Sequence, residues 1–111
     1  MEEMYISAIK AFIHEHLKEE FSLNELAEKI GYSAFHLSRE FKNTENLSIM
    51  EYTRNQRILA ASKEIESGRN IYDTAFDYCF ETHAGFTKAF IAVFGCTPTE
   101  FKEHSSRGRI C

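Results

Sequence analysis

Apolar residues recur at helical spacing from the beginning of the chain. The first set forms one stripe on a helix of 3.6 residues per turn. Its members are Tyr5, Ile9, Phe12, Ile13 and Leu17. Charged residues fill the opposite side of the same helix, as in a surface helix with one buried face. No segment of four to eight residues alternates apolar and polar side chains, which is the pattern of a half-buried strand. The pattern therefore predicts an all-α protein.

Capping signals divide the rest of the chain into further helices. Ser22 and Glu25 have capping-box spacing, and Gly31, which tolerates a left-handed backbone, ends the helix that they begin. Ser33 then caps a third helix that runs to about Thr44. Later helices begin at Ser48, Asn70, Thr82 and Thr97-Pro98, and two of them end at Ser67-Gly68 and Gly95. The sequence therefore predicts seven helices.

The second and third predicted helices recur as the fifth and sixth. The two copies align when one extra residue is allowed in the turn between the helices of the second copy. The paired positions are Leu23 and Ile71, Glu25 and Asp73, Ala27 and Ala75, Ile30 and Tyr78, Leu37 and Phe86, Ser38 and Thr87, Arg39 and Lys88, and Phe41 and Phe90. Two helices joined by a short turn form a helix-turn-helix unit, whose second helix enters the major groove of DNA. The repeat predicts two such units, joined by a long linker helix.

The third predicted helix has two different faces. Leu37 and Phe41 lie one turn apart and are expected to face the core. The opposite face carries an aromatic ring, a hydroxyl and two cations, from Phe35, Ser38, Arg39 and Lys42. Such a face suits bases and phosphates, with the arginine bidentate to guanine and the phenyl ring on a thymine methyl. The alternative is an ordinary solvated face with Phe35 packed against the core.

The equivalent face of the sixth predicted helix is less polar. It carries Ala84, Thr87, Lys88 and Ile91, with His83 at the beginning of the helix. Only one side chain with a permanent positive charge remains, so we expect this half to bind DNA more weakly. We interpret His83 as a neutral polar contact or a surface residue, although its intrinsic pKa leaves protonation open.

The linker helix, from 48 to 68, is long enough to connect two reading units. It would extend roughly 30 Å at 1.5 Å per residue, close to the ~34 Å between successive major grooves. Arg54 and Arg57 lie one turn apart near its beginning, where they suit phosphate contacts. Ordinary solvent-exposed charges are the alternative for each of them.

The formal net charge of −4 argues against DNA binding, but its distribution does not. Residues 33–63 are the only net-positive segment, and at physiological salt a local positive face matters more than the total.

The three cysteines, Cys79, Cys96 and Cys111, are unevenly spaced, and we expect free thiols rather than a zinc site or disulfide framework. No catalytic motif, metal spacing or phosphate-binding glycine loop is present, so we expect neither an enzyme nor a cofactor.

Four runs of the sequence follow the pattern of a known family, and the last of them is the most specific: FSLNELAEKIGYSAFHLSREFK, EYTRNQRILAASKEI, IYDTAFDYCFETHAGFTKAF and FGCTPTEFK. Through these runs, residues 21–102 resemble the DNA-binding domain of the AraC/XylS family of transcription regulators. The resemblance implies homeodomain-like repeats and one domain that binds across two successive major grooves. Two positions depart from the family pattern. Cys79 stands where the family has a turn glycine, and residues 91–92 stand where it has basic residues.

Family contacts to DNA transfer to this chain position by position. The resemblance places base or groove contacts at Ala34, Phe35, Ser38, Arg39, Thr82, His83, Ala84, Thr87 and Lys88. With the reasoning above, Ser33, Lys42, Arg54 and Arg57 complete the set as phosphate contacts. We expect Arg39→Ala to abolish specific binding and Lys88→Ala only to weaken it.

These predictions define one DNA-binding domain over 1–111. Its parts are a first helix-turn-helix subdomain (about 4–46), the linker helix (48–67), a second subdomain (70–104) and a flexible tail (105–111). The expected partners are double-stranded promoter DNA and RNA polymerase, as for an activator, and a small-molecule effector through a domain absent from this chain. The beginning of the chain lacks the layout of a secretory signal and no apolar run could span a membrane, so we expect a cytoplasmic, nucleoid-associated monomer. The alternative function is a protein-interaction module of the same fold that has lost DNA affinity.

Overall fold

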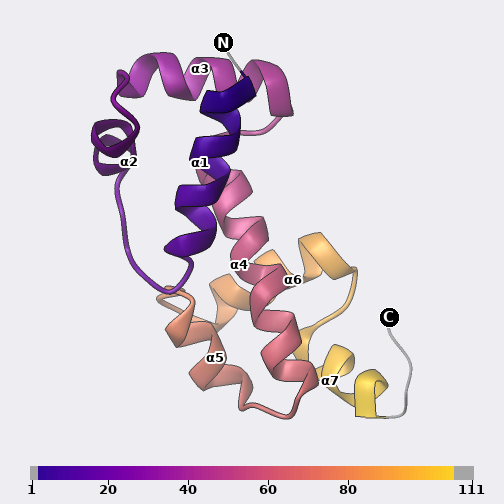
Figure 1. Ribbon diagram of the computed structural model, residues 1–111. Helices are drawn as coiled ribbons and strands as arrows, with labels where there is room; N and C mark the ends of the chain where they lie inside the picture. Colours follow the sequence, from indigo (N-terminus) through magenta and orange to yellow (C-terminus); the bar gives the residue numbers. More distant parts are fainter. Residues whose placement is uncertain (1–2, 107–111) are drawn as a thin grey trace. The chain divides into compact units, whose positions relative to one another are not determined.

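The computed structural model describes residues 3–106, and over that range it is built from helices without a strand (Figure 1). The helices are α1 (Glu3–Glu15), α2 (Leu23–Ile30), α3 (Ala34–Glu45), α4 (Ile49–Glu66), α5 (Ile71–Asp77), α6 (His83–Phe94) and α7 (Pro98–Ser106). These seven helices confirm the predicted fold class, including the two helix-turn-helix units and the linker helix, α4. The helix α7 includes the first two residues of the predicted flexible tail, and 107–111 lie outside the described residues.

The predicted capping residues begin the helices. The hydroxyl of Ser48 accepts a hydrogen bond from the backbone N–H of Glu51 (3.0 Å), while the Glu51 carboxylate accepts one from the backbone N–H of Ser48 (2.8 Å). The same reciprocal pair joins Thr97 and Glu100 at α7. These side chains satisfy backbone donors that the first turn of a helix leaves without partners. The capping boxes therefore place α4 and α7 where the sequence predicts them.

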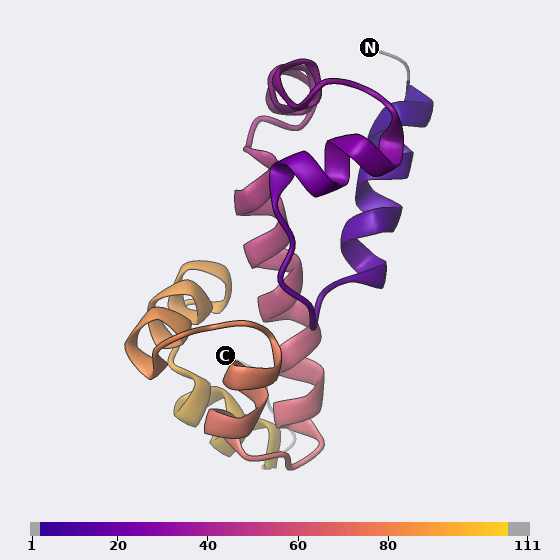
Figure 2. The ribbon, with the colours of Figure 1, turned by 90° about the vertical axis from the view of Figure 1, so that its left-hand side faces the viewer.

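The chain divides into two compact units, residues 1–53 and 54–111, with the boundary inside α4. In the first unit, α2 and α3 cross, since Figure 1 shows α3 from the side and α2 along its axis, and Figure 2 shows the reverse. The buried core of this unit consists of Ile6, Ile9, Ile13, Leu26, Ala27, Leu37, Phe41 and Ile49. The apolar stripe of α1 therefore packs with α2 and α3, and Ala27 provides the small side chain that their close approach needs.

The second unit has an aromatic core. Phe86 and Phe90 of α6 are fully buried, and the Phe90 ring meets Phe101 of α7 with 5.3 Å between centroids. Phe94 also contacts Phe101, at 5.0 Å. Because edge and tilted ring contacts of this kind bury large apolar surfaces, the phenylalanine stripe holds α6 against α7.

A polar network connects the end of α4 to α5 and α7 in the second unit. The guanidinium of Arg69 donates to the carboxylates of Glu64 (2.7 Å) and Asp77 (2.6 Å). The Tyr78 hydroxyl donates to the second oxygen of Glu64 (2.5 Å), and the Lys102 ammonium donates to the backbone carbonyl of Arg69 (3.3 Å). This network fixes the turn between α4 and α5, where Gly68 has a φ of 106°.

The expectation of free thiols is only partly correct. Cys79 is not part of a disulfide, whereas Cys96 is disulfide-bonded, and Cys111 lies outside the described residues. Sequence spacing alone does not show which cysteines a fold brings to bonding distance, so the prediction failed at Cys96. Within residues 3–106, no helix is both long and apolar enough to cross a membrane.

Candidate nucleic-acid interface

The helix α3 separates a buried face from an exposed one. Leu37 and Phe41 are fully buried, as predicted. Phe35 is 70% exposed, so the alternative in which it packs against the core is wrong. Arg39 is also exposed, and Ser38 is half-buried beside it. An exposed phenyl ring costs hydration free energy unless a ligand covers it, which makes this face a candidate binding surface.

The beginning of α3 is held by a small cluster of side chains. The Ser33 hydroxyl accepts from the backbone N–H of His36 (3.2 Å) and lies 3.1 Å from His36 Nδ1. The imidazole stacks on the ring of Tyr32, with 5.1 Å between centroids, and meets Phe35 edge-on at 6.2 Å. Ala34 is half-buried and packs against the core. These contacts fix the orientation of the exposed rings at the end of the helix that is expected to enter the groove.

The other end of α3 is anchored to α1. Lys10 and Glu45 form an ion pair with 2.8 Å between Nζ and Oε1, and the ammonium lies 5.5 Å from the ring centre of Tyr52. The hydrogen bond to Glu45 raises the pKa of Lys10 above its ordinary value. Since Tyr52 also lies 3.3 Å from His14 through its hydroxyl, this corner holds α1, α3 and the beginning of α4 together. The exposed face of α3 is therefore presented on a rigid support.

The cations of the first unit are available to a ligand to different degrees. Arg39 forms no ion pair with any carboxylate in the described part of the chain. Lys42 has only an exposed, long pair with Glu51, at 3.9 Å. An exposed pair of this length contributes little, so it presents no barrier to a phosphate. Both positive charges can therefore meet an anion.

The helix α6 shows the same division as α3. Phe86 and Phe90 face the core, while Ala84 and Lys88 are exposed and Thr87 is half-buried. Thr82 caps the helix, because its hydroxyl accepts a hydrogen bond from the backbone N–H of Gly85 (3.0 Å). On the exposed face of the helix, 43% of Ile91 is accessible to solvent. The structure therefore brings the predicted residues of the second copy to one exposed face.

Sequence reasoning missed an aromatic pair on α5. Tyr72 is 63% exposed and Phe76 is 79% exposed, and the ring of His83 stacks on Tyr72 with 4.2 Å between centroids. These rings line a cavity of about 160 Å³ with Phe80 and residues 81–83. The signal was present in the repeat, since the first copy has polar residues, Asn24 and Glu28, at the positions of Tyr72 and Phe76. His83, the first residue of α6, is therefore a stacked surface residue.

The two arginines of α4 differ in exposure. Arg54 is exposed and, within residues 3–106, has no ion-pair partner. Arg57 is half-buried and interacts with other groups of the protein. Of the two predicted phosphate contacts on this helix, Arg54 is therefore the more accessible. Among residues 3–106, no group of three or more His, Cys, Asp and Glu side chains could hold a metal ion.

Comparisons with known proteins agree with this arrangement. A family model described as a helix-turn-helix domain matches residues 26–104. The chain is 37% identical to the probable transcription factor PqrA of Proteus vulgaris over 79% of this chain and 73% of PqrA. It is 33% identical to the transcriptional activator AarP of Providencia stuartii over 87% of this chain and 73% of AarP.

Solved structures show the same fold. The DNA-binding domain of the global transcriptional factor AdpA, solved in complex with a target DNA, superposes with a TM-score of 0.83 at 21% identity. The match covers 93% of this chain and 94% of that domain. With the family match, the two relatives and the pair of helix-turn-helix units, the chain belongs to the AraC/XylS family of transcription regulators.

Proposed function

We propose that this domain binds promoter DNA sequence-specifically by inserting α3 and α6 into successive major grooves. The observation that carries the proposal is the exposed face of α3. There the Phe35 ring is exposed outside the core, and Arg39 forms no ion pair within residues 3–106. Arginine reads guanine through two parallel hydrogen bonds, and a phenyl ring covers a thymine methyl. The AdpA domain, which has the same fold, was solved with its target DNA.

The base contacts in this proposal come from both recognition helices. On α3 they are Ala34, Phe35, Ser38 and Arg39, and on α6 they are Thr82, His83, Ala84, Thr87 and Lys88. Ser33, Lys42, Arg54 and Arg57 contact phosphates. Base contacts select the sequence, whereas phosphate contacts fix the register of the protein on the duplex.

We also propose that the domain activates transcription by contacting RNA polymerase at a nearby promoter. AarP, which shares 33% identity with this chain, is named as a transcriptional activator. A transcription assay on a promoter that carries the selected site tests this part, with activation expected and repression contradicting it.

DNA binding is tested by selecting bound sites from random duplexes and measuring fluorescence anisotropy at two salt concentrations. Each neutralised phosphate contributes about −0.9 to the slope of log K against log salt concentration, so we expect a total slope of several units. Arg39→Ala should abolish specific binding and Lys88→Ala should only weaken it, with Lys63→Ala as the control on an exposed cation outside the interface. Equal losses in the first two variants contradict the ranking.

The second candidate is a protein-interaction module. It is favoured by the net charge of −4 and by Phe76, whose exposed ring is more typical of a protein interface than of a DNA surface. A flat salt dependence would favour this function over DNA binding.

A further inference from the structure

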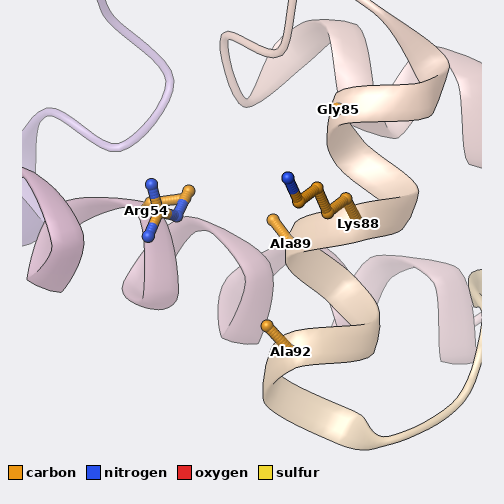
Figure 3. Close-up of a pocket in the computed structure, with 5 residues that line it drawn as sticks. All are labelled: Arg54, Gly85, Lys88, Ala89 and Ala92. Atoms are coloured by element: carbon orange, nitrogen blue, oxygen red, sulfur yellow. The ribbon is translucent and has the colours of Figure 1, made fainter.

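A cavity of about 330 Å³ lies between α4 and α6 in the second unit (Figure 3). Arg54 lines it from α4, and Gly85, Lys88, Ala89 and Ala92 line it from α6. Figure 3 shows the Lys88 side chain extending toward the side of α4 that carries Arg54. The size is at the lower end of ligand cavities, which suits a small chemical group rather than a whole cofactor.

The charges of this cavity are both positive. Arg54 and Lys88 line it without a carboxylate, and neither forms an ion pair elsewhere in residues 3–106. Two like charges that face one cavity repel each other, and an anion between them converts the repulsion into two attractions. The cavity therefore has the electrostatics of an anion site.

The wall formed by α6 is unusually open. Gly85, Ala89 and Ala92 follow each other at helical spacing, so Lys88 is the one long side chain among the α6 residues that line the cavity. In the first copy of the repeat the equivalent positions are His36, Glu40 and Asn43, which are larger and include a negative charge. This row of small residues on the second helix of the repeat is therefore specific to the second unit.

We propose that Arg54 and Lys88 together clamp one backbone phosphate of the DNA, so that Lys88 positions the duplex instead of reading a base. This inference rests on the proposed function and moves Lys88 from its base contacts to its phosphate contacts. A lysine ammonium is a compact point charge that suits a phosphate oxygen, whereas bidentate recognition of guanine favours arginine. A phosphodiester of the strand that α6 contacts supplies the anion. The clamp explains why Lys88→Ala should weaken binding without abolishing specificity.

The test replaces single phosphates of a selected duplex, one at a time, by uncharged methylphosphonates. At 0.1 M salt one lost phosphate contact should weaken binding about eight-fold, from the slope of 0.9 per contact. We expect one phosphate linkage at which wild type loses this factor, Arg54→Gln and Lys88→Gln each lose less, and the double variant loses nothing further. Both variants should weaken the unmodified duplex and an unrelated duplex by the same factor.

Matched variants separate the clamp from a general effect of charge. Lys63→Gln removes a cation from the same long helix, and it should bind like wild type and remain sensitive at the same linkage. Lys88→Arg should also retain that sensitivity. Thermal unfolding of each variant, followed by circular dichroism, checks that the fold is intact.

Four results overturn the proposal. The clamp alone fails if the duplex binds with a steep salt slope but no phosphate linkage loses its sensitivity to methylphosphonate when both residues are substituted. It also fails if the loss of affinity in Lys88→Gln depends on the identity of one base pair. A third outcome is that inorganic phosphate binds the free protein saturably, that both substitutions remove this binding, and that no phosphate linkage of the duplex is sensitive to methylphosphonate. This outcome would assign the cavity to a free phosphorylated ligand. Failure to bind any duplex would instead remove the proposed function and the clamp together.

Discussion

Cys79 has a left-handed backbone, with a φ of 70°, in the turn after α5. A side chain in this conformation costs about 1–2 kcal/mol of folding free energy. Glycine removes this strain, but its more flexible unfolded chain offsets part of the gain. We therefore expect Cys79→Gly to raise the free energy of unfolding by about 0.5–1 kcal/mol in urea titrations. The matched control is Gly31→Ala at the equivalent turn, where φ is 85° and a loss is expected. A loss of stability in Cys79→Gly would show that the thiol contacts outweigh the backbone strain.

Phe35 and Leu37 are neighbours on α3 with opposite exposure, which separates binding from stability. Phe35→Ala should change the free energy of unfolding by no more than about 0.5 kcal/mol, because 70% of the side chain is already exposed. Leu37→Ala should cost about 2–5 kcal/mol, because that side chain is fully buried. Urea unfolding measures both changes, and anisotropy with the selected duplex should show weaker binding by Phe35→Ala. If Phe35→Ala unfolds as easily as Leu37→Ala, the ring supports the core.

Helix boundaries depend on local chemistry, which a substitution at a cap can measure. Ser48→Ala removes the acceptor for the Glu51 backbone N–H and should cost about 1 kcal/mol of unfolding free energy. Ser48→Asp keeps an acceptor at the same position and should retain most of the stability. Urea titration of both variants tests the cap, and equal stability of Ser48→Ala and wild type would assign the beginning of α4 to packing alone.

The elements that sequence reasoning predicted well are those set by residues close together in the chain. Ser33 and the residue three positions later determine the beginning of α3, and its end at Glu45 lies one residue beyond the predicted Thr44. Helical periodicity placed Phe35 on the face opposite the core but left open that its ring packs against the core, and the structure shows that the ring is exposed. The network around Arg69 could not be predicted, because it depends on how α4, α5 and α7 pack in three dimensions. The stacking of His83 on Tyr72 likewise requires two helices to meet.

The junction between α4 and α5 should make stability depend on alkaline pH. Burial, followed by the hydrogen bond to Glu64, raises the pKa of Tyr78 above its ordinary value. A raised pKa gives stability that is fully present below the unfolded pKa, near 10, and is lost as the pH rises above it, because only the unfolded chain then ionises readily. Tyr78→Phe should cost about 1 kcal/mol at pH 7 and show a shallower fall above pH 10.

Urea unfolding at pH 7, 9 and 10.5 measures this dependence. Tyr72→Phe is the matched control, since it removes an exposed hydroxyl and should leave both the stability and the alkaline slope unchanged. An identical alkaline slope in wild type and Tyr78→Phe would show that other groups cause the loss of stability.

At the scale of the whole molecule, the net charge of −4 is compatible with a DNA-binding face. Arg39 on α3 and Lys88 on α6 are exposed and form no ion pairs within residues 3–106, whereas Lys10 and Arg69 are paired with carboxylates. Screening over about 8 Å at physiological salt limits the influence of distant acidic residues. The available positive charge, rather than the total, therefore determines affinity for a duplex.

The helix α4 runs without interruption across the boundary between the two units, and its 18 residues extend about 27 Å. If α3 and α6 occupy major grooves about 34 Å apart, as we propose, this helix should transmit the spacing of the two half-sites. Inserting five base pairs between them turns one half-site by about half a helical turn, and anisotropy at fixed salt should then show only the affinity of a single half-site.

Ten inserted base pairs should not restore binding, because they return the half-site to the same side of the duplex at a distance that α4 cannot span. Replacing the same five spacer base pairs without changing the length is the control, and it should preserve affinity. Binding to the five-base-pair insertion that is as tight as to the parent duplex would mean that the two units reach their half-sites independently.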